Sequence, residues 1–429
     1  MSPDMSSAPP VTPPPSPGGP GRPGWPGRLD KWLAGLPRPE GGWQMPLLFA
    51  LGGALMATVV CILLFSGGGH SGKATDAGGN AQQRSRLPTG VPKAGAGSWT
   101  GGATPSDDPS ADPGTLPGTD AGTGAGTGAD GAAACPAATV TVSSADDLSS
   151  ALSSAAPGTV IDLADGTYQG QFTGTAVGTA DQPVYLCGGP GAVLDGGTTG
   201  KGYVLHIQGS AYWHLVGFTV QNGQKGVVLD HTQHSTVQGL TVRRIGDEAI
   251  HLREFSSDNL VLGNTVEDTG LNRDKYGEGV YLGSAKSNWC SLTNCRPDTS
   301  DRNTVKDNVF DRTTAENVDV KEGTTGGSIL DNTFDGDGIT SDGGSAWINV
   351  KGNGYLIQGN TGHDSPEDGF QTHEILKGWG TGNIFKDNTA DVDGPGYGFH
   401  LTPVQDNKVT CDNKVKGAGK GLSNVPCSH

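Results

Sequence analysis

The sequence predicts an all-β, right-handed parallel β-helix, preceded by one transmembrane helix and by segments that do not fold. Three observations indicate this architecture. The C-terminal part repeats at a period of about 25 residues, an uncharged apolar run lies near the N-terminus, and glycine and proline are in large excess. The chain has 429 residues, including 72 Gly and 28 Pro, and a formal net charge of −16. One ordinary globular domain does not have this composition, so we divide the chain first.

The N-terminal third contains no pattern that predicts a buried core. Residues 1–45 are rich in Pro and Gly, and we expect them to be disordered. Residues 46–66 contain the uncharged run PLLFALGGALMATVVCILLF, long enough for a transmembrane helix. A cleaved signal peptide, which would release the protein, is the alternative; it would need an unusually long n-region, and no clear cleavage site follows. Residues 67–134 are Gly, Ala, Thr, Pro and Asp with few large apolar residues, as in a flexible stalk.

The remaining residues, 135–429, form the predicted β-helix head. Basic residues weakly favour the N-terminal side of residues 46–66, which predicts a single-pass membrane protein with an extracellular head. The head holds six of the seven cysteines, an even number in a compartment where disulfides persist. Proximity favours two pairs and leaves a third; free cysteines or a metal site fit less well, because the spacing lacks paired CxxC motifs. The expected pairs are Cys290 with Cys295, Cys411 with Cys427, and Cys135 with Cys187.

The repeat is defined by a column of turn residues. Successive members are separated by 22, 24, 44, 24, 28, 28 and 25 residues, and the nearly doubled interval contains the insertion SAKSNWCSLTNCRPDTSDR. Short strands, turn asparagines and little helical pattern predict coils of a parallel β-helix that bury their apolar side against one another. We assign the asparagines a structural role in the turns. The column is Phe218, Leu240, Asn264, Asn308, Asn332, Asn360, Asn388 and Asn413.

A second column of short strands separates two faces by alternation. The inward positions are Val227, Ile250, Val280, Val318, Ile348, Phe370 and Phe399, each followed two residues later by Leu229, Leu252, Leu282, Val320, Val350, Thr372 and Leu401. The outward positions hold His251, Tyr281, Asp319, Asn349, Gln371 and His400, beside Asp230, Arg253, Gly283, Lys321, Lys351, His373 and Thr402. Glu248, Glu278, Glu316 and Asp368 lie just before the strands. A solvated polar face is the plain interpretation, but the outward histidines, tyrosine and glutamine are residue types that contact sugars.

The start of the head and the strand ENVDVK resemble carbohydrate-active proteins. PGTVIDLADGTY resembles the opening of pectin-lyase-like right-handed β-helices, closest to chondroitinase-B-type and alginate-lyase-type polysaccharide lyase family 6. That family has a glutamate calcium ligand five residues before a catalytic lysine, on a strand followed by an NTF turn. Glu316, Lys321 and the NTF sequence at residues 332–334 are similar to this pattern. On the next coil the family has an arginine where this chain has Lys351, a departure because lysine offers only a point charge.

The chemistry implied by these residues is β-elimination from a uronate polymer. It requires a base for the proton beside a carboxylate and a cation that neutralises this carboxylate. We expect Lys321 as the base, with Lys351 as a second catalytic residue. Ca²⁺ is the expected cofactor, a hard ion suited to carboxylate ligands; its expected ligands are Glu278, Glu316 and Asp319. The expected substrate-binding residues are His251, Arg253, Tyr281, Asn349, Gln371, His373 and His400, with His373 a rival acid or base.

The predicted partner is an acidic polysaccharide or cell-surface glycan. An acidic chain without a basic stripe or a phosphate loop does not favour a nucleic-acid partner. Three alternatives to a lyase stay open: a C5-epimerase that shares the proton abstraction, a non-catalytic glycan-binding protein, and a structural surface protein. A zinc site from His and Asp on adjacent coils has no HExxH or paired-Cys motif in its support.

Overall fold

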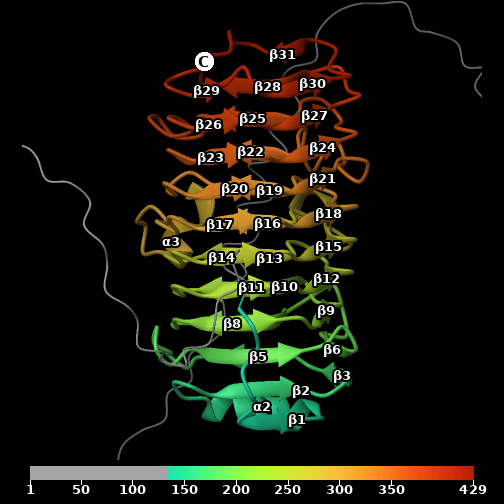
Figure 1. The fold of residues 1–429 in the computed structure, drawn as a ribbon, viewed down its shortest axis with the longest axis vertical. Coiled ribbons are helices and arrows are strands. Elements are labelled where there is room, and N and C mark those ends of the chain that lie inside the picture. The colour runs from blue at the N-terminus through green and yellow to red at the C-terminus, as the bar shows by residue number, and fades with distance from the viewer. Residues whose placement is uncertain (1–132) are drawn as a thin grey trace, which may run out of the picture. The chain divides into compact units, whose positions relative to one another are not determined.

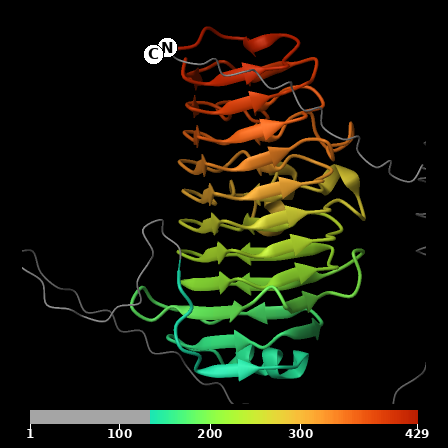
Figure 2. The same ribbon diagram turned by 45° about the vertical axis from the view of Figure 1, so that its right-hand side comes forward.

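Residues 133–429 form a parallel β-solenoid in the computed structural model, which describes this part of the chain (Figure 1). Its coils stack along one axis, and Figure 2 shows the same stack from a second direction. The β-helix is right-handed, the hand that connections between parallel strands take almost without exception. The predicted fold class of the head is therefore confirmed. Residues 1–45, the span at 46–66 and nearly all of the stalk lie outside the described residues. Within residues 133–429, no helix has the length and apolar character needed to cross a membrane.

Three sheets run the length of the solenoid, and each coil contributes short strands to them. The first sheet contains β1 (Val140–Val142), β2 (Val160–Leu163), β5 (Val184–Gly188), β8 (Trp213–Val216), β11 (Thr236–Gln238), β14 (Leu260–Leu262), β17 (Thr304–Lys306), β20 (Ser328–Leu330), β23 (Leu356–Gln358), β26 (Ile384–Lys386) and β29 (Lys408–Val409). The second contains β3 (Gly166–Gln169), β6 (Ala192–Asp195), β9 (Thr219–Gln221), β12 (Thr241–Arg243), β15 (Thr265–Glu267), β18 (Val309–Asp311), β21 (Thr333–Asp335), β24 (Thr361–His363), β27 (Thr389–Asp391) and β30 (Lys414–Lys416). The third contains β4 (Phe172–Gly174), β7 (Tyr203–Gln208), β10 (Lys225–Asp230), β13 (Ile250–Arg253), β16 (Val280–Leu282), β19 (Val318–Val320), β22 (Ile348–Val350), β25 (Phe370–His373), β28 (Tyr397–Thr402) and β31 (Gly421–Ser423).

The third sheet has the register that alternation predicts. Ile250 pairs with Val280, Val280 with Val318, and Val318 with Ile348, so the inward side chains form one continuous column. All of them are fully buried. The column continues into Phe370 and Phe399, whose rings stack with centroids 4.8 Å apart. The same register fixes the outward column, because alternate residues of a strand point to opposite faces.

The turn asparagines form a ladder of buried side chains, as their periodic spacing predicts. The Asn308 side-chain amide donates to Asn332 Oδ1 at 2.9 Å, and Asn332 donates to Asn360 Oδ1 at 2.9 Å. Each amide also donates to a carbonyl of another coil, as Asn332 does to Val305 O at 2.9 Å. The ladder satisfies backbone groups that the turns would otherwise bury without partners. It has a structural role.

A helix at the N-terminal end, α2 (Ala145–Ser154), was not predicted from the sequence. Its Ser144 N-cap accepts a hydrogen bond from the Asp147 backbone N–H at 3.2 Å. The helix buries Leu148, Ala151 and Leu152 against the first coils. Repeat proteins need such a cap because the end coil would otherwise expose the core.

The insertion between β16 and β17 adds short helices to one coil. It contains η2 (Lys286–Asn288) and α3 (Trp289–Leu292), and the preceding loop contains η1 (Asp274–Tyr276). A disulfide joins Cys290 to Cys295, as expected from the sequence. The other expected pairs, Cys135 with Cys187 and Cys411 with Cys427, are also formed. The insertion places polar residues beside the outward face of the third sheet.

Candidate active site

A pocket of about 280 Å³ lies on the outward face of the third sheet, where β16, β19 and β22 adjoin the insertion. The sheet contributes Tyr281, Asp319, Lys321 and Lys351, and Glu278 and Glu316 come from the turns that lead into β16 and β19. Residues from η1 and the insertion complete the lining: Lys275, Tyr276, Ala285, Ser287 and Asn288, with Gly343 from the loop before β22.

Asp319 holds two lysines at the base of the pocket. Lys351 Nζ lies 2.6 Å from Asp319 Oδ1, and Lys321 Nζ contacts Asp319 Oδ2. Asp319 is only 1% exposed, so both ion pairs are shielded from water. Lys321 Nζ also lies 4.6 Å from the centroid of the Tyr281 ring, at cation–π distance. We call Tyr281, Asp319, Lys321 and Lys351 the Asp319 cluster.

The protonation of the Asp319 cluster follows from burial and from these charges. Burial alone raises the pKa of Asp319 and lowers that of Lys321. The two lysines nevertheless hold the Asp319 pKa below its ordinary value, and Asp319, Tyr281 and Glu278 raise the Lys321 pKa well above its ordinary value. Burial raises the pKa of Tyr281 well above its ordinary value, while the Lys321 ammonium acts in the opposite direction. In this arrangement Lys321 is an ammonium and Tyr281 a neutral phenol.

Two neighbouring side chains have polar atoms without partners. Glu278 Oε2 and Asn349 Oδ1 are inaccessible to water and accept no hydrogen bond from the described residues. The Asn349 amide donates to Glu316 Oε1 at 3.1 Å. Burial raises the pKa of Glu278 well above its ordinary value, and the charges of Glu248 and Asp319 add to this effect. Buried polar atoms without partners are rare in proteins, and each needs an explanation; in the described residues they also occur elsewhere, for example Tyr355 Oη and Asp391 Oδ1.

Two groups of side chains could hold a metal ion by proximity. Glu278, Glu316 and Asp319 each offer an oxygen within 4.8 Å of the others, the set expected from the sequence. Asp335, His363 and Asp364, on adjacent coils of the second sheet and its turns, form the other. Its members are partly or fully exposed.

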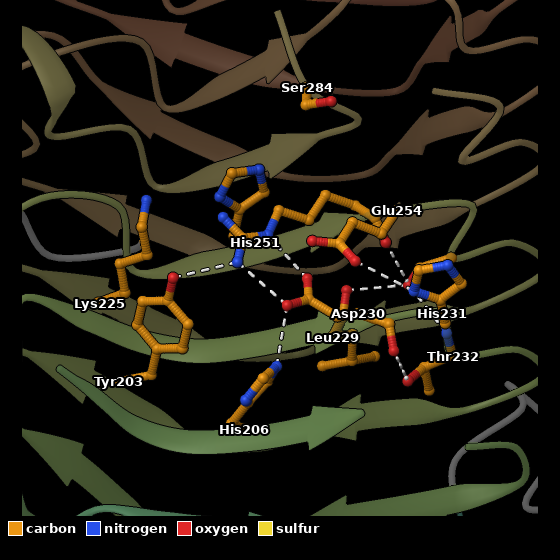
Figure 3. A network of polar contacts seen from close by, with 12 residues as sticks. Tyr203, His206, Lys225, Leu229, Asp230, His231, Thr232, His251, Glu254 and Ser284 are labelled. Atoms are coloured by element: carbon orange, nitrogen blue, oxygen red, sulfur yellow. Dashed lines mark hydrogen bonds and ion pairs between the residues drawn. The ribbon is translucent and has the colours of Figure 1, made fainter. Parts of the chain in front are cut away.

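Other residues expected at the site lie on either side of the pocket. Toward the N-terminus, His251 is buried, with its ring centroid 4.3 Å from that of Tyr281 and its Nε2 2.9 Å from Gly283 O. Arg253 instead forms a second network on β7, β10 and β13. Figure 3 labels Tyr203, His206 and Asp230 of this network. Arg253 Nε donates to Asp230 Oδ1 at 2.7 Å and its Nη2 to Tyr203 Oη at 3.1 Å. His206 Nε2 lies 2.9 Å from Asp230 Oδ2. We call Tyr203, His206, Asp230 and Arg253 the Asp230 cluster.

Toward the C-terminus, buried Asp368 organises the outward residues. His400 Nδ1 and Gln371 Nε2 each lie 2.8 Å from Asp368 Oδ2. His373 Nε2 lies 3.0 Å from Gln371 Oε1. The pKa of His373 is lowered, mainly by burial and to a smaller extent by the positive charge of Lys351. His373 and His400 are partly exposed. The two histidines are therefore oriented by partners beneath them while their rings face outward.

Sequence reasoning missed two contributions to the pocket. The first is the wall made by η1 and the insertion, whose conformation has no repeat to predict it. The second is the organising role of Asp230 and Asp368, which were placed correctly in the repeat but given no partner. The register of the strands was the available signal, because it sets Asp230 directly beside Arg253.

Comparison with known proteins identifies the relatives of this chain. A family model described as "Periplasmic copper-binding protein (NosD)" matches residues 195–417, more than half of the chain. An alginate lyase from Paenibacillus sp. str. FPU-7, whose structure has been solved, has 35% sequence identity to this chain. The match covers 68% of this chain and 100% of that chain, with a TM-score of 0.63.

More distant solved structures include pectate lyase Pel9A and a mannuronic-acid-specific family 6 lyase from human gut microbiota. Pel9A is 13% identical and has a TM-score of 0.45, with coverage of 68% of this chain and 82% of that chain. The family 6 lyase is 15% identical and has a TM-score of 0.35, with coverage of 65% and 83% respectively. At these scores they add nothing to the argument about the site. No curated protein sequence matches the chain.

Proposed function

We propose a function from the premise that this chain belongs to the NosD family and to the pectin-lyase-like β-helix proteins. The latter group includes the alginate lyase from Paenibacillus, all of which is covered by 68% of this chain. The proposed function is that of a polysaccharide lyase that cleaves a uronate-containing polymer by β-elimination at the Asp319 cluster. The observation that carries the proposal is the convergence of Tyr281, Lys321 and Lys351 in one pocket on the outward face. The 35% sequence identity to an alginate lyase supports a uronate-containing polymer as the substrate.

Elimination from a uronate requires two proton transfers. A base removes the C5 proton, the electron pair forms the C4–C5 double bond, and the bond from C4 to the glycosidic oxygen breaks. The leaving oxygen then takes up a proton. Tyr281 and Lys321 are the two residues that we assign to these transfers, because both line the pocket and lie in contact with each other.

Tyr281 and Lys321 act as a coupled pair in this proposal. When Tyr281 is a neutral phenol and Lys321 is an ammonium, neither group can accept the C5 proton. Loss of one proton from the pair gives either phenolate and ammonium or phenol and amine, two forms with the same proton count. In that state the pair accepts the C5 proton and returns a proton to the leaving oxygen.

Lys351 supplies the positive charge for the substrate carboxylate. A carboxylate beside C5 opposes the build-up of negative charge when the proton leaves, so a cation must offset it. Lys351 Nζ lines the pocket and is one coil from Lys321 in the same outward column. It is bonded only to Asp319 among the described residues, which leaves other N–H donors for a ligand.

The polymer is proposed to extend along the third sheet toward the C-terminal end. His373 and His400 present their rings there, held by Gln371 and Asp368, and we assign them to sugar binding. Arg253 is engaged by Asp230 and Tyr203, so we assign it to the structure of the neighbouring coils instead.

The site is proposed to lie outside the cell, on a head tethered by the span at residues 46–66 and the stalk at 67–134. The three disulfides of the head support an oxidising compartment. The description of the matching family as periplasmic agrees with this location. Extraction of membranes at high pH tests the anchor: an anchored chain stays in the membrane fraction, and a chain whose span has been cleaved is released.

The proposed reaction is tested with the full-length chain and a panel of alginate, pectate, chondroitin sulfate and dermatan sulfate. The ultraviolet absorbance of the unsaturated product is expected to rise with at least one uronate polymer. A change in uronate composition without chain cleavage would instead establish an epimerase. Binding to a polymer without any chemical change would establish a glycan-binding protein.

A further inference from the structure

We infer that the pocket works without a bound divalent cation, because Lys321 and Lys351 already bind Asp319, one of the three carboxylates (Glu278, Glu316 and Asp319) that could hold such an ion. The proximity of the three carboxylates is what a calcium site requires. The inference rests on the proposed function only in assigning Lys351 to the substrate carboxylate.

The oxygens of Asp319 are already engaged. Oδ1 lies 2.6 Å from Lys351 Nζ, and Oδ2 contacts Lys321 Nζ. Asp319 is the one member of the three that reaches both lysines, and it is fully enclosed. A divalent ion at Asp319 would therefore lie against two ammonium groups in a site shielded from water, where repulsion between like charges is strongest.

The charges of the pocket balance without a metal. The lining contains three carboxylates, Glu278, Glu316 and Asp319, and three ammoniums, Lys275, Lys321 and Lys351, so its ionised side chains carry no net charge. A divalent ion added to this neutral set would leave a net charge of +2 in a buried site. If the ion displaced the ammoniums from Asp319, they would remain buried without a counter-ion, an arrangement that is strongly unfavourable.

Two atoms would otherwise favour a metal. Glu278 Oε2 and Asn349 Oδ1 are buried oxygens without partners. A carboxylate oxygen of Glu278 and the amide oxygen Asn349 Oδ1 can each accept a hydrogen bond from a donor such as a sugar hydroxyl. These two oxygens suit a ligand with hydroxyl donors and do not require an ion.

The lysines are expected to be the reason that calcium does not bind. Thermal unfolding of the full-length chain is measured with Ca²⁺ at about 1 mM, where weak extracellular calcium modules are occupied. The melting temperature of the wild type should not change with Ca²⁺. Removal of both ammoniums in Lys321→Met/Lys351→Met leaves the carboxylates unbalanced, so Ca²⁺ should raise the melting temperature of this variant. Adding Asp319→Asn to the double variant should abolish the effect.

The single variant Lys351→Met gives the same comparison if the double variant does not fold. Stoichiometric Ca²⁺ binding by the wild type that Asp319→Asn removes would overturn the inference. Failure of both the double variant and Lys351→Met, when folded, to gain Ca²⁺ binding would also overturn it, because the ammoniums would then not be what excludes the ion. Isothermal titration with Ca²⁺ measures the stoichiometry.

Lyase activity separates this inference from the proposed function. Activity that is unchanged by a chelator agrees with both. Activity that a chelator abolishes and Ca²⁺ restores would contradict the inference and leave the lyase assignment intact. Absence of product from every uronate polymer would contradict the lyase assignment, while the calcium-binding comparison would still decide the inference.

Discussion

The Asp319 cluster and the Asp230 cluster are built on the same principle and have different consequences. Each places one buried aspartate between basic side chains on the outward face of the third sheet. In the Asp230 cluster Arg253 binds Asp230 through two nitrogens and also reaches Tyr203, so the network is closed on itself (Figure 3). The Asp319 cluster instead lines a pocket and adjoins two oxygens without partners. A buried charge pair is therefore common to both clusters, and the pocket and the two oxygens without partners are what distinguish the Asp319 cluster.

The largest expected difference between the clusters is in activity. Lys321→Ala and Tyr281→Phe each remove one proton-transfer group, and we expect the rate of unsaturated product formation to fall about 10²-fold to 10⁴-fold. Lys201→Ala, at an exposed position near β7, is the matched control and should keep the wild-type rate. A wild-type rate in Lys321→Ala would show that this lysine takes no part in the chemistry.

The Asp230 cluster should respond in stability instead. Arg253→Ala leaves Asp230 buried beside only His206, and loss of one partner of a buried ion pair costs about 3–5 kcal/mol of unfolding free energy. The pKa of Asp230 is lowered because His206 and Arg253 outweigh the effect of burial. Urea unfolding measures the loss. The folded fraction of Arg253→Ala should form unsaturated product at close to the wild-type rate. A large loss of activity with unchanged stability would instead assign Arg253 to substrate binding.

The pH dependence sharpens the role of the Asp319 cluster. Both Tyr281 and Lys321 have raised pKa values, so the pair loses its extra proton only at alkaline pH and activity should rise with pH through that range. Asp319 is the largest influence that raises the Lys321 pKa. Asp319→Asn should therefore move the alkaline rise to lower pH, with Glu278, Glu316 and Lys351 still facing the pair. An unchanged profile in Asp319→Asn would contradict the coupling.

The smallest expected effect belongs to the turns, away from both clusters. Asn332→Ala removes a rung of the asparagine ladder and leaves neighbouring buried groups without partners, at about 1–3 kcal/mol of unfolding free energy. Activity should not change. Asn294→Gly, at an exposed turn position with a positive φ, should leave the stability near that of the wild type. Equal changes in unfolding free energy for the two variants would show that the asparagine ladder does not stabilise the fold.

The repeat made most of the fold predictable. The spacing of Asn264, Asn308 and Asn332 gives the coils, and alternation around Val318 and Val320 gives the inward and outward columns that the strand register has. Segments without a repeat were not predictable, because only tertiary packing decides their conformation. Helix α2 and the pocket wall from η1 and the insertion belong to this class.

The sequence predicts which residues belong to the candidate site, but it does not predict which of their side chains form ion pairs. Alternation placed Asp319, Lys321 and Lys351 on one face, but which lysine reaches which oxygen depends on side-chain conformations that a sequence pattern does not contain. The proximity of Lys321 to Tyr281 likewise arises between adjacent coils, with Tyr281 directly beside Asp319 in the register. The pairing between strands therefore decides side-chain contacts that the alternation within one strand does not.

The Asp319 cluster is proposed to catalyse β-elimination in a uronate polymer. The most direct measurement is the ultraviolet absorbance of unsaturated product when the full-length wild type and Lys321→Ala, matched in concentration and folded fraction, are incubated with alginate and the other uronate polymers. We expect the wild type to form product and the variant to form it at a rate at least about 10²-fold lower. No product from the wild type with any of these polymers, or equal rates from the two proteins, would contradict the proposal.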